Sequence, residues 1–171
     1  MLINVIRENL ARSQSASRAR RFEEAVHILD EFRAMLRAAP PSSDEVLQLL
    51  QEVIADPSMP EASDVFTAAW YSLSQDYVPP LCKILSGEYL AAWHEQTVEL
   101  LGELQNPEAI SVLVKSLTYH WDFDEWLCIP RKALHSLVAI GTEEALAVVQ
   151  LAMQSDVPEI RNEAAELLES P

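Results

Sequence analysis

The fold is decided by residues 129–169, IPRKALHSLVAIGTEEALAVVQLAMQSDVPEIRNEAAELLE. Apolar residues recur there at spacings of three and four, which is the period of amphipathic helices. The helical pattern is interrupted at Gly141 and Thr142, and again at the sequence QSDVP of residues 154–158. Gly, Ser, Asp and Pro are typical of turns. Residues 129–169 therefore predict consecutive helices joined by short turns.

The same pattern occurs earlier in the chain. Residues 99–117 match residues 135–153 in apolar position at an offset of 36, residues 160–169 match 130–139 at an offset of 30, and residues 79–86 match 111–118. The pairs at the first offset are Leu101 with Leu137, Leu104 with Ile140, Ala109 with Ala145, Ile110 with Leu146, and Leu113 with Val149. Periods in the thirties with two helices each predict stacked helical hairpins.

These residues carry a resemblance to a known family. Residues 126–169, with Arg131, Ala133, Leu134, Leu137, Ile140, Gly141, Thr142, Ala145 and Arg161, resemble the short HEAT-like repeat first associated with phycobilisome lyases. The resemblance implies that Asp156, Arg161 and Arg131 bond to neighbouring repeats. Glu95 or Gln96 stands where the preceding repeat would have an arginine, so the series of arginines is incomplete.

A narrower resemblance concerns a bacterial group of small HEAT-repeat proteins, some of which are identified as immunity proteins of polymorphic toxin systems. It is carried by Trp93, His94, Leu101, Asn106, Pro107, Asp124, Arg131, Lys132, Gly141 and Thr142. This resemblance implies a protein that binds and neutralises a toxin.

The sequence of the N-terminal half predicts less regular helices that are separated by prolines. Residues 20–39 place Phe22, Ala25, Val26, Leu29, Phe32 and Leu36 at helical spacing, and two prolines at 40–41 end that helix. Ser42 or Ser43 begins the next helix, and Ser63 or Asp64 the one after it, in which Tyr71 and Leu73 are candidate core residues. Residues 12–21, polar and basic, are either a disordered lead-in or a connection between helices.

We therefore predict an all-α fold, a right-handed α-solenoid of HEAT-like helical hairpins with an N-terminal capping helix. All 171 residues form one domain in this interpretation. Residues 1–41 are a basic segment and the capping helix, 42–76 a degenerate hairpin, and 77–171 the HEAT-like repeats.

Composition excludes several classes of function. The glycines at 87, 102 and 141 are too far apart to form a phosphate-binding loop, and no GxSxG sequence is present. Cys82 and Cys128 lack zinc spacing, so we expect both to be reduced and buried. No signal peptide and no apolar run of membrane length is found, which favours a cytoplasmic protein. We predict no cofactor and no enzymatic activity.

Charge is distributed unevenly. Residues 1–40 hold seven Arg and five acids, whereas residues 41–171 hold five Lys or Arg and 22 acids, which gives balances of +2 and −17. An acidic body repels nucleic acid and attracts basic partners. A plain contribution to solubility is the alternative explanation.

The sequence TYHWDFDEWLCIP, residues 118–130, lengthens the turn between the two helices of one repeat. Its acids and His120 do not match an EF-hand loop, so we expect no metal there. Its aromatic residues either pack locally or form a binding hot spot, because insertions in a repeat often map to the binding face.

Polar residues outside the apolar stripe of each second helix form the other part of the candidate site. One expectation is a face that is simply solvated; the alternative is one largely acidic concave surface. His94 and His135 are expected at the surface or between helices. The predicted partner-binding residues are His120, Trp121, Asp122, Phe123, Asp124, Glu125, Trp126, Glu99, Glu103, Arg131, His135, Glu163 and Glu166.

The predicted function is a non-enzymatic protein-binding module, in its concrete form an immunity protein that neutralises a basic toxin or effector. We expect neither nucleic acid nor a membrane among its partners. A lyase or chaperone acting on chromophore proteins, and a general structural scaffold, are the alternative hypotheses.

Overall fold

The protein, described by a computed structural model over residues 2–19, 21–87, 91–119 and 127–169, is built from helices throughout these ranges. Its contacts divide the chain into two compact units, Met1–Tyr77 (unit 1) and Val78–Pro171 (unit 2). In each unit, successive helices pair into hairpins whose apolar faces meet.

Unit 1 contains two helical hairpins. Helices α1 (Leu2–Arg18) and α2 (Phe22–Ala38) form the first, and α3 (Ser43–Ala55) and α4 (Ala62–Trp70) form the second, followed by the 3-10 turn η1 (Gln75–Tyr77). Residues 12–18, part of the stretch for which the sequence leaves two alternatives open, belong to the end of α1. The core face of α1 is narrow, with Leu2, Ile6, Asn9 and Ala16 buried, and this explains why periodicity alone does not reveal the helix.

Polar contacts join α1 to the second hairpin. The Arg7 Nε donates to Glu61 Oε1 at 3.0 Å, and the amide of Leu2 donates to Glu45 Oε1 at 3.4 Å. Burial raises the pKa of Asp64. A hydrogen bond with Asn9 acts in the opposite direction but is outweighed. These bonds satisfy polar groups that α1 would otherwise bury against its neighbours.

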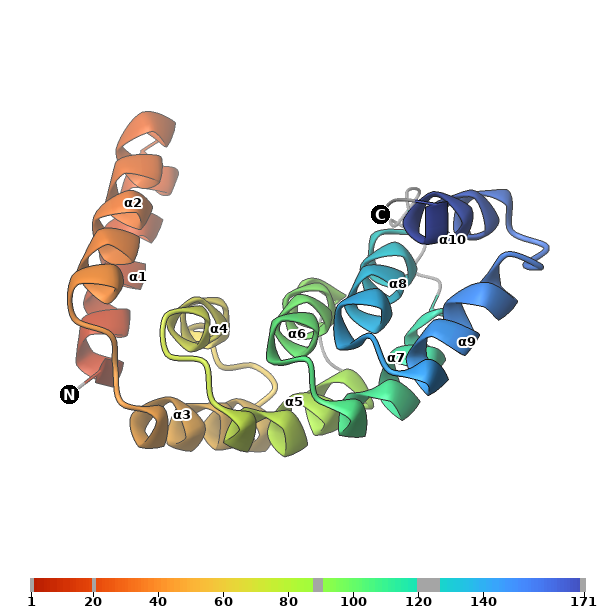
Figure 1. Ribbon diagram of the computed structural model, residues 1–171. Coiled ribbons are helices and arrows are strands. Elements are labelled where there is room, and N and C mark those ends of the chain that lie inside the picture. The colour runs from red at the N-terminus through yellow and green to blue at the C-terminus, as the bar shows by residue number, and fades with distance from the viewer. Residues whose placement is uncertain (1, 20, 88–90, 120–126, 170–171) are drawn as a thin grey trace. The chain divides into compact units, whose positions relative to one another are not determined.

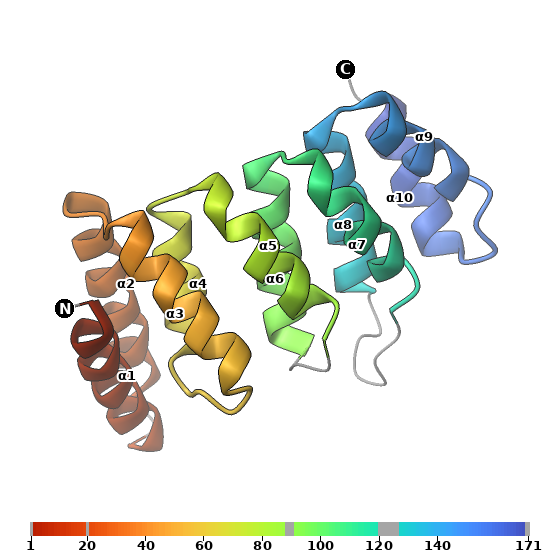
Figure 2. The same cartoon turned by 90° about the horizontal axis from the view of Figure 1, so that it is seen from below.

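Unit 2 contains α5 (Val78–Leu85), α6 (Ala91–Leu104), the 3-10 turn η2 (Pro107–Ala109), α7 (Ile110–Ser116), α8 (Cys128–Ile140), α9 (Glu143–Ala152) and α10 (Pro158–Glu169). Helices α6, α8 and α10 lie side by side in one layer, and α5, α7 and α9 form the other (Figures 1 and 2). Fully buried leucines, among them Leu81, Leu101, Leu113 and Leu134, fill the space between the layers.

The structure explains why glycine occupies two positions in unit 2. A Cβ on Gly102 of α6 would lie 2.6 Å from Ser136 Oγ and 3.1 Å from Ser136 Cα on α8, so this close approach of two helices requires glycine. Gly141 ends α8 with a φ of +68°, the left-handed conformation that glycine adopts most easily. Thr142 then caps α9 by accepting a hydrogen bond from the amide of Ala145.

Several local expectations need correction. Phe22 and Val26 are exposed, and Ile28 takes their place in the core face of α2 with Phe32 and Leu36. The N-cap residue of α4 is Glu61, without a side-chain cap, and Leu73 is exposed. Ser42 is the cap of α3.

The thiols of Cys82 and Cys128 are free but only half-buried. Burial, reinforced by the nearby charge of Glu108, raises the pKa of Cys82 to about 11, which keeps this thiol protonated.

Candidate partner-binding face

The layer of α6, α8 and α10 carries most of the charged residues that the sequence singles out, and we refer to it as the α6–α8–α10 face. Its charges alternate by helix. The acids lie on α6 and α10, whereas α8 between them carries Arg131, Lys132 and His135. Neighbouring helices of the layer therefore present opposite charges to one another.

Lys132 links α8 to α6. Its ammonium group is paired with the carboxylates of both Glu95 and Glu99, one turn apart on α6. Burial by itself would lower the pKa of Lys132. The hydrogen bonds and charges of the two glutamates outweigh burial, so the pKa of Lys132 is raised. About a third of each of these side chains is exposed, so the cluster is partly solvated.

Glu163 links α10 to α8. Its side chain is only 10% exposed, and its two carboxylate oxygens bond to Arg131 Nε at 2.5 Å and His135 Nε2 at 2.7 Å. Burial opposes ionisation of Glu163, but hydrogen bonds from Arg131 and His135 prevail and lower its pKa. The Arg131 and His135 side chains are 44% and 57% exposed, so the Arg131 guanidinium lies on the solvent side of the cluster.

These contacts add detail to the expected, largely acidic surface. The three helices carry seven acids, at positions 95, 99, 103, 159, 163, 166 and 169, and three Lys or Arg residues, at 131, 132 and 161. Three of the acids are engaged in the ion pairs described above. Glu103 and Glu159 are exposed at the surface of this face. The face remains acidic on balance, with a cationic stripe along its middle helix.

Residues 120–126 of the predicted site, His120 to Trp126, lie outside the described residues. Next to this segment, Tyr119 donates its hydroxyl to the Leu85 carbonyl oxygen at 2.6 Å, and its ring lies 5.5 Å from that of His94. Of the two expected positions for His94, at the surface or between helices, the structure gives the buried one, and burial lowers the pKa of His94 despite a hydrogen bond involving Gly87. On the other side of the segment, Leu127 has a φ of 51° and precedes α8.

The arginine contacts implied by the resemblance are realised in part. Arg131 bonds across to the next repeat through Glu163. Arg161 instead donates to the carbonyl oxygen of Ser155 at 2.7 Å, in the turn before its own helix. Its contact therefore stabilises a turn within one hairpin.

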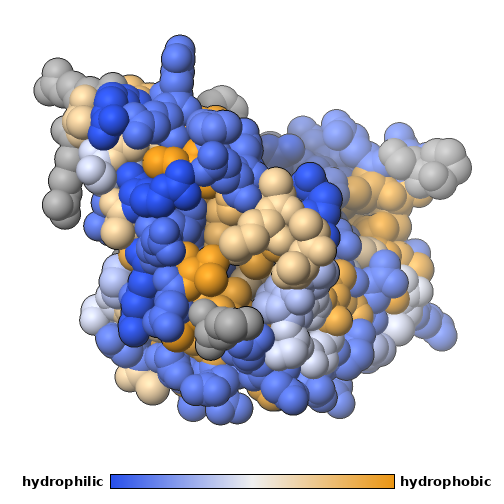
Figure 3. Space-filling view, turned by 90° about the vertical axis from the view of Figure 1, so that its left-hand side faces the viewer, coloured by the Kyte–Doolittle hydropathy of each residue, from blue (hydrophilic) through white to orange (hydrophobic). Residues whose placement is uncertain are grey.

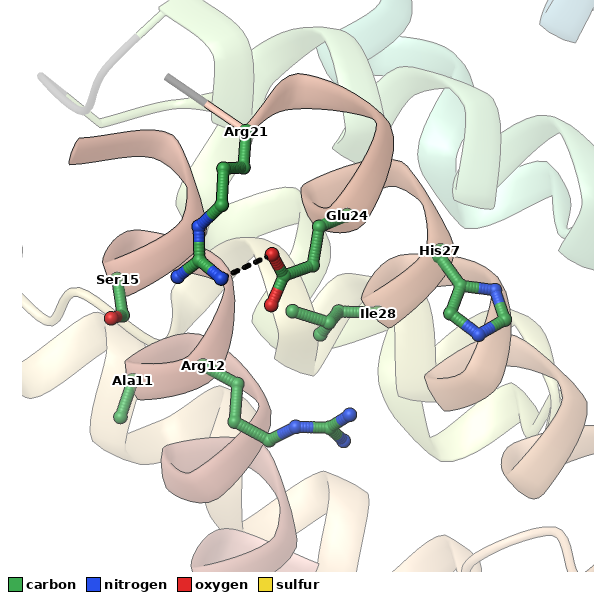
Figure 4. Close-up of a pocket in the computed structure, with 7 residues that line it drawn as sticks. All are labelled: Ala11, Arg12, Ser15, Arg21, Glu24, His27 and Ile28. Atoms are coloured by element: carbon green, nitrogen blue, oxygen red, sulfur yellow. Dashed lines mark ion pairs between the residues drawn. The ribbon is translucent and has the colours of Figure 1, made fainter. Parts of the chain in front are cut away.

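A pocket of about 490 Å³ lies in unit 1 between α1 and α2 (Figure 4). It is lined by Ala11, Arg12, Ser15, Arg21, Glu24, His27 and Ile28. The guanidinium groups have carboxylate partners, since Arg21 pairs with Glu24 at 2.5 Å and Arg12 with Glu31 at 2.6 Å. Over the described parts of the chain, no cluster of three or more metal-ligating side chains occurs.

The arrangement of helices and the repeated offsets now have a counterpart among known proteins. The family model for HEAT repeats matches residues 78–169. The chain belongs to the HEAT-repeat family. The predicted all-α solenoid of HEAT-like hairpins is thereby confirmed, and HEAT repeats are in general scaffolds for protein interaction.

A search of solved structures gives a similar fold in human deoxyhypusine hydroxylase in complex with glycerol. The two chains share 21% identity and a TM-score of 0.61 over 77% of this chain and 45% of the other. The HEAT-repeat chain described here thus spans less than half the length of that protein, and the likeness concerns the fold. No curated protein matches the sequence.

In the described ranges, no helix has both the length and the hydropathy needed to cross a bilayer.

Two parts of the face were missed by sequence reasoning. Lys132 and Glu95 were not among the predicted partner-binding residues, although they form one of the two ion clusters. Ser136, buried, joins α8 to α6 by donating to the Val98 carbonyl oxygen at 2.8 Å. The signal for the first pair was present, because opposite charges on adjacent second helices recur at separations close to the repeat length.

Proposed function

We propose that this HEAT-repeat protein is a non-enzymatic binding module that takes up a basic protein partner on the α6–α8–α10 face. The observation that carries the proposal is the surplus of acids on that face, with Glu103 and Glu159 exposed on the two outer helices of the layer. A positive partner would be attracted to the outer helices and aligned by the cationic stripe of α8 between them.

The internal ion pairs favour binding over catalysis. They hold the side chains of Lys132 and Glu163 in fixed positions before a partner arrives, which lowers the entropy lost on binding. The hydrogen bond between His135 and Glu163 is one of these contacts between helices. A solenoid also leaves a long side of its layer open, as an extended protein contact requires.

The concrete form of this function is neutralisation of a basic toxin or effector. In such a role the acidic face would cover the working surface of the toxin, which in nucleases and other anion-binding enzymes is cationic. The acids and aromatic residues of 120–126, which the sequence inserts between α7 and α8, would belong to the same contact.

Growth protection tests this form of the function. We expect that the product of an adjacent gene arrests growth when expressed alone, and that coexpression of the HEAT-repeat chain restores growth. The double substitution Glu103→Lys and Glu159→Lys should abolish protection, whereas Glu143→Lys with Glu144→Lys, on exposed positions of α9 in the other layer, should preserve it. Protection that survives the first pair would contradict neutralisation through the α6–α8–α10 face.

A further inference from the structure

Helix α2 presents a second face that its core does not use. The core face consists of Ile28, Phe32 and Leu36, four residues apart. Phe22, Val26, Arg33 and Arg37 fall within about 60° of one another on the helix, on a different side, and all four are exposed. We call these four residues the outer α2 face.

The outer α2 face is apolar in its first half and cationic in its second half. Phe22 and Val26 are 68% and 60% exposed and lie about one turn apart on this face. Arg33 and Arg37 follow two turns later, about 10 Å along the helix axis. Figure 3, which looks at the side of the molecule where α1 and α2 lie, shows apolar atoms among a mostly hydrophilic surface.

The cationic end is continued by aromatic residues from the end of α4. The Arg37 guanidinium lies 5.8 Å from the centre of the Tyr71 ring, and its Nη2 donates to the Tyr71 hydroxyl at 3.4 Å. Trp70 and Leu73 beside Tyr71 are 37% and 45% exposed. Arginine, tyrosine and tryptophan are the residues most enriched at the centres of protein interfaces.

Residues 1–40 together have the opposite charge to the rest of the chain, although α2 itself holds four acids, Glu23, Glu24, Asp30 and Glu31, beside Arg33 and Arg37. Seven of the twelve Lys and Arg residues lie in residues 1–40, and the remaining residues carry a balance of −17. On α2, Arg33 has Asp30 at 3.7 Å as its acidic neighbour, with both side chains about half exposed, so this pair is weak. Glu24 and Glu31 are paired with Arg21 and Arg12, so an acidic partner would be attracted on α2 to Arg33 and Arg37 and repelled by the acidic residues 41–171.

We propose that the outer α2 face docks an acidic amphipathic helix of a second protein. Apolar residues of that helix would pack on Phe22 and Val26, and carboxylates two turns along it would pair with Arg33 and Arg37. This surface lies in unit 1 and selects the opposite charge from the α6–α8–α10 face, so it stands independently of the function proposed for unit 2. The pocket of Figure 4 is lined by other residues of α2 and takes no part in it.

Fluorescence anisotropy with two labelled model helices of about 18 residues tests the proposal. Both helices carry the same leucine stripe, with glutamate on the remaining surface of one and lysine on that of the other. The glutamate helix should bind the full chain, and Phe22→Ser and Arg37→Glu should each weaken its binding at least tenfold, as loss of a hot-spot residue does. Arg33→Glu provides a second charge reversal if circular dichroism shows that Arg37→Glu alters the fold.

The matched controls lie in unit 2. Leu151 is 66% exposed, close to Phe22, and Lys115 is exposed, so Leu151→Ser and Lys115→Glu should change the affinity less than twofold. Binding of the lysine helix should not respond to Phe22→Ser or Arg37→Glu. The proposal is overturned if the glutamate helix does not bind, or if its affinity is insensitive to Phe22 and both arginines. It is also overturned if vesicles of anionic lipid displace the glutamate helix, since the face would then belong to a membrane contact.

Discussion

Glu163 shows how a single buried acid determines the arrangement of two helices. Replacing it with glutamine keeps its size but removes the charge that holds Arg131 and His135, so we expect Glu163→Gln to lower the free energy of unfolding by about 1–3 kcal/mol at pH 7. Because the pKa of Glu163 is lower in the folded state than its ordinary 4.5, this stabilisation is complete above pH 4.5 and is lost as the pH falls through the folded-state value. Urea unfolding at pH 7 and pH 3.5 should show the difference between the two proteins shrinking in acid. A constant difference would contradict the ion-pair account.

His94 contributes a pH dependence at higher pH. Its burial lowers its pKa below the ordinary 6.5, so the unfolded chain binds a proton more readily than the folded one. The stability that depends on the neutral ring is therefore present above pH 6.5 and is lost as the pH falls further. We expect the wild type to lose more stability between pH 7.5 and 5.5 than His94→Gln does. Equal losses, measured by urea unfolding, would show that His94 is not the group that titrates.

At the scale of elements, the contact between α6 and α8 depends on the absence of a side chain at Gly102. Gly102→Ala places a Cβ against the Cβ and backbone of Ser136, at 3.0 and 3.1 Å, so the two helices must move apart. The better helix propensity of alanine offsets part of this effect, and we expect a net destabilisation of about 1–2 kcal/mol in thermal or urea unfolding. Glu103→Ala, at the exposed neighbouring position, should be within about 0.5 kcal/mol of the wild type. If Gly102→Ala left the free energy of unfolding unchanged, α6 and α8 would have to be packed less closely than the structure shows.

Two adjacent serines at the start of α3 have different roles. Ser42 accepts a hydrogen bond from the amide of Glu45 at 3.3 Å and donates one to its carboxylate, whereas Ser43 is the first residue of the helix. Ser42→Ala should cost about 1 kcal/mol, or roughly 2–4 °C in Tm, and Ser43→Ala much less. A larger loss of Tm for Ser43→Ala than for Ser42→Ala would show that Ser43, and not Ser42, caps the helix.

Sequence patterns predicted the elements best where apolar spacing and turn residues agree. Around Gly141 and Thr142 both signals coincide, and the end of α8 and the start of α9 follow them. On α2, apolar residues lie on two sides of the helix, and only packing against α1 decides that Ile28 is buried while Phe22 and Val26 are not. For the candidate site, sequence reveals which residues are polar, but not that Glu163 reaches Arg131 and His135, because that contact depends on how adjacent repeats are stacked.

At the scale of the whole molecule, membership of the HEAT-repeat family accounts for the layered helices, and the charge pattern gives them different surfaces. The helices of the α6–α8–α10 face carry seven of the 22 acids of residues 41–171, and they also hold cations by ion pairs, so this surface is negative and cross-linked between helices. Binding at such a face should weaken with salt, because its exposed acids are screened over about 10 Å at 0.1 M ionic strength.

The central claim is that the α6–α8–α10 face binds a basic protein. It is tested most directly by capture from a native cell lysate on the immobilised chain, with Glu103→Lys/Glu159→Lys and Glu143→Lys/Glu144→Lys as the paired variants. The account predicts that a basic protein is retained by the wild type and by the α9 variant, is lost from the Glu103→Lys/Glu159→Lys variant, and elutes as salt is raised. A retained protein that is not basic, or one that the two variants hold equally well, would contradict it.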